Sequence, residues 1–155
     1  MTEIDINDVD AINQAATQEF GDWGPEVLVT QDMVDQFADL TGDRQWIHVD
    51  VERCERESPF GGPIAHGFLT LALMPQVMPP ATFTPTGVKN AVNYGSDGFR
   101  FLAPVPVGSS LHARTRLCGA ESHRAGTLVT TETAIHVVGN DKPSLRYTGK
   151  ILYQG

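Results

Sequence analysis

Residues 41–48 of this chain read Thr-Gly-Asp-Arg-Gln-Trp-Ile-His, and residues 62–68 read Gly-Pro-Ile-Ala-His-Gly-Phe. In the first stretch an acid, Asp43, and a histidine, His48, lie five positions apart. The second stretch is a turn rich in proline and glycine that opens an apolar segment. Together they can supply a proton-transfer pair and a backbone amide aimed at developing negative charge. Addition of water to a double bond beside a carbonyl needs both.

A helix is predicted just before Asp43. Thr30 is a good N-cap, and Gly42 stands where a C′ glycine commonly ends a helix. Asp43 and His48 are therefore expected on an irregular connection, with little core packing of their own. Catalytic groups are often found on such connections.

After the second stretch, residues 66–78 predict a long, strongly apolar helix, which Pro75 is expected to kink or end early. Apolar residues on nearly every side indicate that this helix is buried. Shorter helices are predicted at about residues 6–20 and 50–57, and a short strand is predicted at 26–29.

The C-terminal half of the chain predicts β-strands. Segments rich in Val, Thr, Leu, Ile, Phe and Tyr alternate with turn formers, at about residues 87–95, 98–103, 109–120, 127–138 and 144–154. Helices followed by a run of antiparallel strands predict an α+β fold. We expect a single domain over residues 1–155, in which the sheet wraps around the long apolar helix.

The overall composition excludes several classes of partner. The net charge of −8 argues against binding to nucleic acid and to an anionic membrane surface. The two cysteines, Cys54 and Cys118, form no CxxC motif, and the acidic first residues lack the features of a signal peptide. We therefore expect a cytoplasmic protein without nucleic-acid or membrane partners.

The two stretches, together with the late strands, resemble the MaoC-like (R)-specific enoyl-CoA hydratases of the hot-dog fold. Four residues match the family's motif Gly-Asp-x-Asn-Pro-Leu/Ile/Val-His: Gly42, Asp43, Ile47 and His48. Gln45 and Trp46 replace the usual Asn and Pro, as in a short, single-domain branch of the family. The resemblance extends from about Trp23 to Tyr153.

This resemblance implies reversible hydration of trans-2-enoyl-CoA to (R)-3-hydroxyacyl-CoA. Asp43 and His48 would activate the water and return a proton to C2, and the Gly67 amide would hold the thioester oxygen as it takes on enolate charge. Four further residues are expected at the substrate: Gln45, Trp46, His66 and Phe68. The family also implies a homodimer and no cofactor besides the CoA of the substrate. The acyl group of the substrate could also be attached to an acyl carrier protein in place of CoA.

Structural explanations stay open for some of these residues. His66 could simply fix the turn before Gly67, Trp46 could pack in the core, and Gln45 could be an ordinary loop amide. Asp43, His48 and His66 could instead form a metal site of two histidines and one carboxylate. No supporting ligand pattern is readable in the sequence, and we expect no metal.

Two other functions also fit the sequence. A hot-dog thioesterase would place an acid near a similar backbone amide, but its water would attack the carbonyl carbon and release free CoA. A non-catalytic subunit that binds acyl thioesters is the second alternative. The intact pair of Asp43 and His48 argues against that alternative, because an inactive subunit has no need of both.

Overall fold

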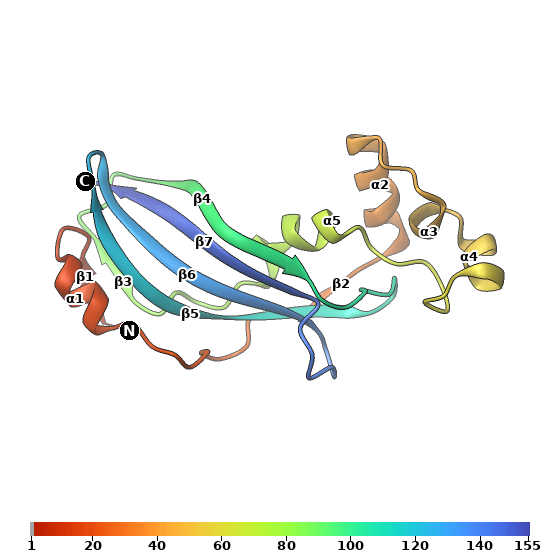
Figure 1. Cartoon of the computed structure of the whole chain (residues 1–155), viewed down its shortest axis with the longest axis horizontal. Coiled ribbons are helices and arrows are strands. Elements are labelled where there is room, and N and C mark those ends of the chain that lie inside the picture. Colours follow the sequence, from red (N-terminus) through yellow and green to blue (C-terminus); the bar gives the residue numbers. More distant parts are fainter. Residues whose placement is uncertain (1) are drawn as a thin grey trace.

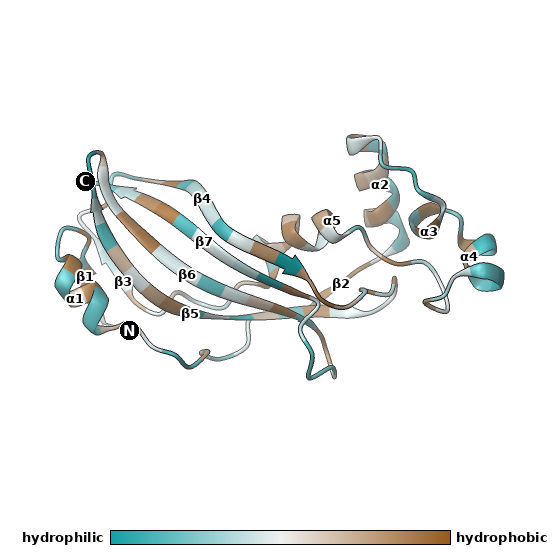
Figure 2. Ribbon diagram, in the orientation of Figure 1, coloured by the Kyte–Doolittle hydropathy of each residue, from teal (hydrophilic) through white to brown (hydrophobic). Residues whose placement is uncertain are grey.

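A curved five-stranded antiparallel sheet is the centre of the computed structural model, which describes residues 2–155 (Figure 1). The strand order is β2-β5-β6-β7-β4. The strands run over Val27–Leu28 (β2), Asn90–Phe101 (β4), Ser110–His123 (β5), Gly126–Val137 (β6) and Leu145–Gln154 (β7). Figure 2 shows apolar and polar residues alternating along the long strands, because successive side chains point to opposite faces of a sheet. The predicted α+β class is confirmed.

The two strands predicted at about residues 87–95 and 98–103 are one strand, β4. Its pairing with β7 shifts register on both sides of Ser96. The Ser96 hydroxyl accepts from the Gly98 N–H at 3.0 Å and donates to the Thr148 carbonyl at 2.8 Å. These bulges carry the strand through residues that otherwise favour a turn, which explains why the sequence pattern looked interrupted.

Helix α2 (Gln31–Thr41) begins and ends as predicted. The Thr30 hydroxyl accepts from the Met33 N–H at 3.2 Å, and Gly42 has a φ of 80°. A residue without a Cβ adopts this left-handed conformation without steric cost. The chain therefore turns sharply just before Asp43.

Helices α3 (Trp46–Val49) and α4 (Val51–Glu57) follow, and with α2 they form a lobe beyond one end of the sheet (Figure 1). The helix expected at about residues 50–57 is confirmed as α4. Asp43 lies on an irregular connection as predicted, but His48 lies within α3 and is buried. The expectation of little core packing is therefore wrong for His48, because a turn of helix carries it inward. None of the helices in residues 2–155 has the length and apolarity needed to cross a membrane.

The apolar helix predicted over residues 66–78 is split into α5 (Gly67–Ala72) and α6 (Met74–Val77). Pro75 lies in the first turn of α6. Proline has no N–H, and its ring clashes with the carbonyl four residues earlier, so α5 cannot continue through it. The interruption at Pro75 is confirmed, while the long continuous helix is wrong. The helix is also not buried on every side, since the Phe68 residue is 59% exposed.

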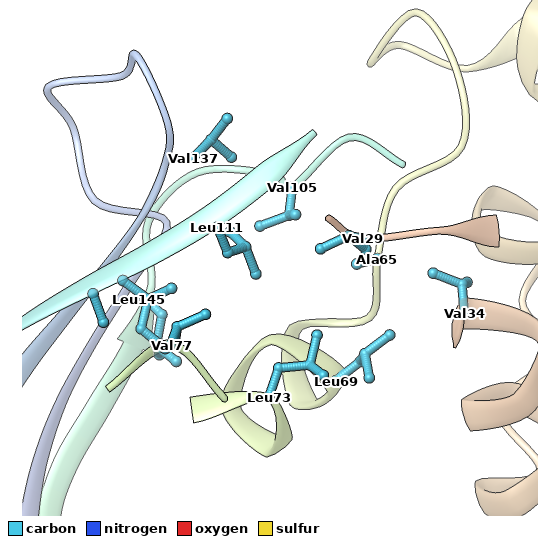
Figure 3. Packing of buried hydrophobic residues seen from close by; sticks show 12 residues of the cluster. Val29, Val34, Ala65, Leu69, Leu73, Val77, Val105, Leu111, Val137 and Leu145 are labelled. Carbon is cyan, nitrogen blue, oxygen red and sulfur yellow. The ribbon is translucent and has the colours of Figure 1, made fainter. Parts of the chain in front are cut away.

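The concave side of the sheet and the broken helix share the main hydrophobic core (Figure 3). Three helix side chains meet three from the strands: Leu69, Leu73, Val77, Leu111, Val137 and Leu145. Full burial of such a side chain stabilises the fold by about 1.5–3 kcal/mol. Ala65, in the turn before α5, belongs to the same cluster. The core therefore sets where α5 begins relative to the sheet.

Helix α1 (Val9–Gln14) is shorter than the helix predicted over about residues 6–20. Strand β1 (Glu3–Asp5) precedes it and pairs in parallel with β3 (Thr84–Thr86), and the sequence pattern predicted neither strand. Beyond α1, three amides in residues 17–24 donate to carbonyls of β5. Hydrogen bonds to a strand edge replace those of a helix, which explains why α1 ends early.

One edge of the sheet is covered and the other is open. Residues 17–24 and β2 lie along the edge of β5, whereas in residues 2–155 no strand pairs with the outer side of β4. All 12 residues of β4 are exposed, including the large apolar side chains of Val92, Tyr94, Phe99 and Phe101. A long open edge with apolar side chains is a template for association.

Candidate active site

His48 is held in place through both its ring and its backbone. Its Nδ1 donates to the Ile64 carbonyl oxygen at 2.6 Å, since a carbonyl can only accept. Gln31 Nε2 donates to the His48 carbonyl at 2.8 Å. With the proton on Nδ1, the other ring nitrogen, Nε2, keeps its lone pair. His48 therefore offers a base at Nε2.

The surroundings of His48 keep its ring neutral. Burial lowers the pKa of His48 from its usual value, and the neighbouring His66 lowers the pKa further. The hydrogen bond to Ile64 and the charge of Asp43 act in the opposite direction, without overcoming the effect of burial. A histidine that stays neutral near pH 7 is in the form that a general base requires.

His66 stacks on His48 and also reaches back to the loop that carries Asp43. The two ring centroids lie 3.8 Å apart, with 26° between the ring planes. His66 Nε2 donates to the Asp43 carbonyl oxygen at 2.8 Å. His66 is buried, and its contacts fix the backbone of Asp43. This arrangement agrees with a structural role for His66, in which its hydrogen bond fixes the local backbone.

The Asp43 carboxylate is exposed beside the two rings. One ligating atom from each of Asp43, His48 and His66 lies within 4.8 Å of the other two. The Asp43 carboxylate also accepts a long hydrogen bond of 3.4 Å from the Gln45 N–H. The acid and the base predicted from the sequence are therefore brought together, with a spacing that one water molecule can bridge.

The same three residues could in principle hold a metal ion, but the ring geometry favours proton transfer. A metal bound by two imidazoles needs lone pairs that converge on one point, at about 2.0–2.1 Å for zinc. The lone pairs of an imidazole lie in its ring plane, and the planes of His48 and His66 are nearly parallel. Their lone pairs therefore run side by side rather than converge.

Gly67 is the first residue of α5, directly after His66. The first amides of a helix have no acceptor within it. In the part of the chain that the structure describes, the Gly67 N–H donates to no other group either. This amide is free to donate to an oxygen that gains negative charge.

A cavity of about 360 Å³ opens beside Gly67. Its walls are largely apolar, with side chains such as Ile64, Phe101 and Val105, and its few hydroxyls come from Thr70 and Ser144. The volume falls within the range of small-molecule sites, roughly 300–1,000 Å³. An apolar cavity that begins at a free amide suits an apolar chain attached to a carbonyl group.

Comparison with known proteins places this chain in a family. The family model of the MaoC like domain matches residues 13–139 of this chain. This chain belongs to the MaoC-like domain family. A 3-hydroxyacyl-thioester dehydratase Z of Mycobacterium tuberculosis is 50% identical over 124 residues, which cover 79% of each chain. Nodulation protein N of Rhizobium meliloti is 40% identical over 152 residues, covering 94% of this chain and 88% of that protein.

Solved structures of the family share the fold. An (R)-hydratase from Pseudomonas aeruginosa superposes with a TM-score of 0.67 at 22% identity, covering 88% of this chain and 82% of that one. The (R)-hydratase from A. caviae gives a TM-score of 0.67 at 20% identity, covering 88% and 97%. At these identities the likeness bears on the fold alone, and it confirms the expected hot-dog fold.

Gly67 lines the cavity, but the other expected site residues lie outside its lining: Asp43, Gln45, Trp46, His48, His66 and Phe68. Gln45 is exposed and precedes α3. The Trp46 ring packs under the guanidinium group of Arg53, whose central carbon lies 4.1 Å from the ring centroid. Phe68 points to the exterior, where it contacts other aromatic rings.

Two groups at the candidate site were not found from the sequence. The Ile64 carbonyl, which sets the tautomer of His48, is a backbone group and leaves no signature in the sequence. Phe101 reaches the site from the end of β4, and a Cβ added to Gly67 would lie 3.0 Å from its ring. No local pattern could have paired these two residues, because only the sheet brings them together. A side chain at position 67 would strike this ring, so substitution of Gly67 does not isolate the role of its amide.

The different burial of Asp43 and His48 predicts different effects on stability. Asp43→Asn should change the free energy of unfolding by less than about 0.5 kcal/mol, because the carboxylate is exposed. His48→Ala should lower it by roughly 1–3 kcal/mol, because the Ile64 carbonyl loses its donor in a buried setting. Denaturant unfolding of both variants measures the difference. Equal stability of the two would show that the ring of His48 contributes nothing to the fold.

Proposed function

We propose that this protein reversibly adds water to trans-2-enoyl-CoA and forms (R)-3-hydroxyacyl-CoA. Two observations carry the proposal: the Asp43 carboxylate lies beside the neutral base of His48, and the free amide of Gly67, the residue after His66, opens onto an apolar cavity. The names of its relatives support the same chemistry, since one of them is a 3-hydroxyacyl-thioester dehydratase.

In the hydration direction, a water molecule held between Asp43 and His48 gives up one proton while its oxygen bonds to C3. The electrons of the C2=C3 double bond move toward C1, and negative charge develops on the thioester oxygen. The Gly67 amide donates to this oxygen and lowers the barrier. C2 then takes a proton from the pair of Asp43 and His48. The product has gained H at C2 and OH at C3, and no oxidant or further cofactor is needed.

The acid and the base should each be essential for turnover. Loss of absorbance of trans-2-butenoyl-CoA and longer enoyl-CoAs follows the reaction, and chiral analysis identifies the product. Asp43→Asn and His48→Gln should each lower kcat by about 10²–10⁴-fold, the usual contribution of a general acid or base. His48→Gln is used because it keeps a side-chain donor that the Ile64 carbonyl can accept from.

Asp39→Asn is the matched control, because Asp39 is an exposed acid of the same lobe that pairs with Arg44. This variant should keep normal turnover. Near-normal hydration by Asp43→Asn or His48→Gln would contradict the assignment of Asp43 and His48 as the acid and base of the reaction. Release of free CoA in place of the hydroxyacyl product would identify a thioesterase instead.

The lowered pKa of His48 predicts the pH dependence of hydration. The base must be deprotonated, so kcat/KM rises with pH as His48 loses its proton. Because burial lowers the pKa of His48, this rise should be centred below the usual histidine value of about 6.5. A profile of kcat/KM against pH reports the groups of the free enzyme. A rise centred above pH 7 would contradict the neutral, buried base.

We also propose that the protein acts as a homodimer that pairs along β4. This strand is the open edge of the sheet, and every one of its residues is exposed. Phe99, Phe101 and Phe68 form an exposed aromatic cluster over the edge and the adjoining helix. Pairing of two copies would satisfy the open edge and cover this cluster.

Sedimentation velocity at micromolar concentration tests the dimer. The expected mass is twice the 16.8 kDa of one chain. Val92→Lys should weaken the dimer, because it places a charge on the exposed face of β4, whereas Val138→Lys, beyond the end of β6, should not. A monomer with full activity would contradict the proposal.

A further inference from the structure

The ring of Phe101 stands against the glycine that begins α5. A Cβ added to Gly67 would lie 3.0 Å from three atoms of the Phe101 ring, which is tighter than an ordinary contact. The edges of the ring meet two more aromatic side chains. Its centroid lies 5.5 Å from those of Phe68 and Phe99, at interplanar angles of 74° and 62°. The Phe101 ring therefore packs between the start of α5 and two neighbouring aromatic rings.

The direction of the groups at the start of α5 indicates where a carbonyl group held by the Gly67 amide would lie. In a helix both the N–H groups and the Cα–Cβ directions lean toward the N-terminus. An oxygen that accepts from the Gly67 N–H therefore lies on the side of α5 where Phe101 stands. The sulfur and C2 of a thioester held in this way, which are bonded to the carbonyl carbon, would come next to the ring.

Of the three aromatic residues in this cluster, only Phe101 lines the cavity. Phe101 and Gly67 both line the cavity of about 360 Å³, whereas Phe68 and Phe99 lie outside its lining. Phe101 also connects to the core through the sheet, since its cross-strand partner is the buried Leu145. A change at Phe101 alters the space next to the amide, and the same change at Phe99 does not.

We propose that Phe101 determines specificity at C2 of the acyl group, so that the site accepts enoyl groups unbranched at C2 and rejects those with a 2-methyl group. The inference rests on the proposed hydration, because it takes the Gly67 amide as the group that holds the thioester oxygen. A methyl group at C2 needs the space that the ring fills. Phe101 itself takes no part in proton transfer.

The test compares kcat/KM for trans-2-butenoyl-CoA with that for its 2-methyl analogue. The wild-type protein should prefer the unbranched substrate by about 10–200-fold, the usual discrimination of one methyl group by an apolar site. Phe101→Leu and Phe101→Ala should narrow this ratio by about tenfold or more. The intrinsic reactivity of the two substrates is the same for every variant, so it cancels when the ratios are compared.

Phe99→Leu is the matched control, because it makes the same change in the same aromatic cluster outside the cavity. In Phe99→Leu the ratio of the two kcat/KM values should stay within about threefold of the wild-type ratio, a smaller change than one methyl group usually causes. Melting curves check folding, and Phe101→Met, which also removes the ring but has a flexible side chain that adapts to the core, replaces Phe101→Leu if that variant unfolds. An unchanged ratio in the Phe101 variants, or an equal change in Phe99→Leu, would overturn the inference while leaving the hydration itself intact. Absence of hydration in the wild-type protein would instead defeat the proposed function, and the inference with it.

Discussion

Two crossed hydrogen bonds between separate segments organise everything else at the site. His48, in α3, donates to the carbonyl of Ile64, just before α5, across 16 positions of sequence. His66, at the start of α5, donates to the carbonyl of Asp43, just before α3, across 23 positions. The stacked rings fill the space between the two segments. The lobe and the start of α5 are therefore joined, and the Asp43 backbone, the His48 ring and the segment that leads into Gly67 are held together.

This arrangement also explains why the base is neutral. Many catalytic histidines are oriented by a carboxylate, and such a neighbour raises the pKa of the ring. Here a backbone carbonyl orients His48, and the ring packed against it is another buried imidazole. Asp43 lies close enough to share a water molecule, but its carboxylate is exposed, so its charge does not overcome the burial of His48.

Features that depend on a few neighbouring residues were predictable from the sequence. Thr30 and Gly42 begin and end α2 because a hydroxyl cap and a left-handed glycine act within one turn of the chain. Pro75 interrupts the apolar helix for an equally local reason. The alternation of the strands predicts their two faces, and the spacing of Asp43 and His48 indicates a paired acid and base.

The sequence by itself thus determined the two ends of α2, the interruption at Pro75, the alternating faces of the strands and the candidate residues of the site. Only the tertiary structure decided that His48 is buried, that the Ile64 carbonyl sets its tautomer and that Phe101 lies on Gly67. It also decided that β4 is one bulged strand at an open edge. The physical reason is separation along the chain. Caps, turns and periodicity arise from bonds and steric contacts between neighbours, whereas these contacts join distant segments that meet only when the core packs and the strands find their register.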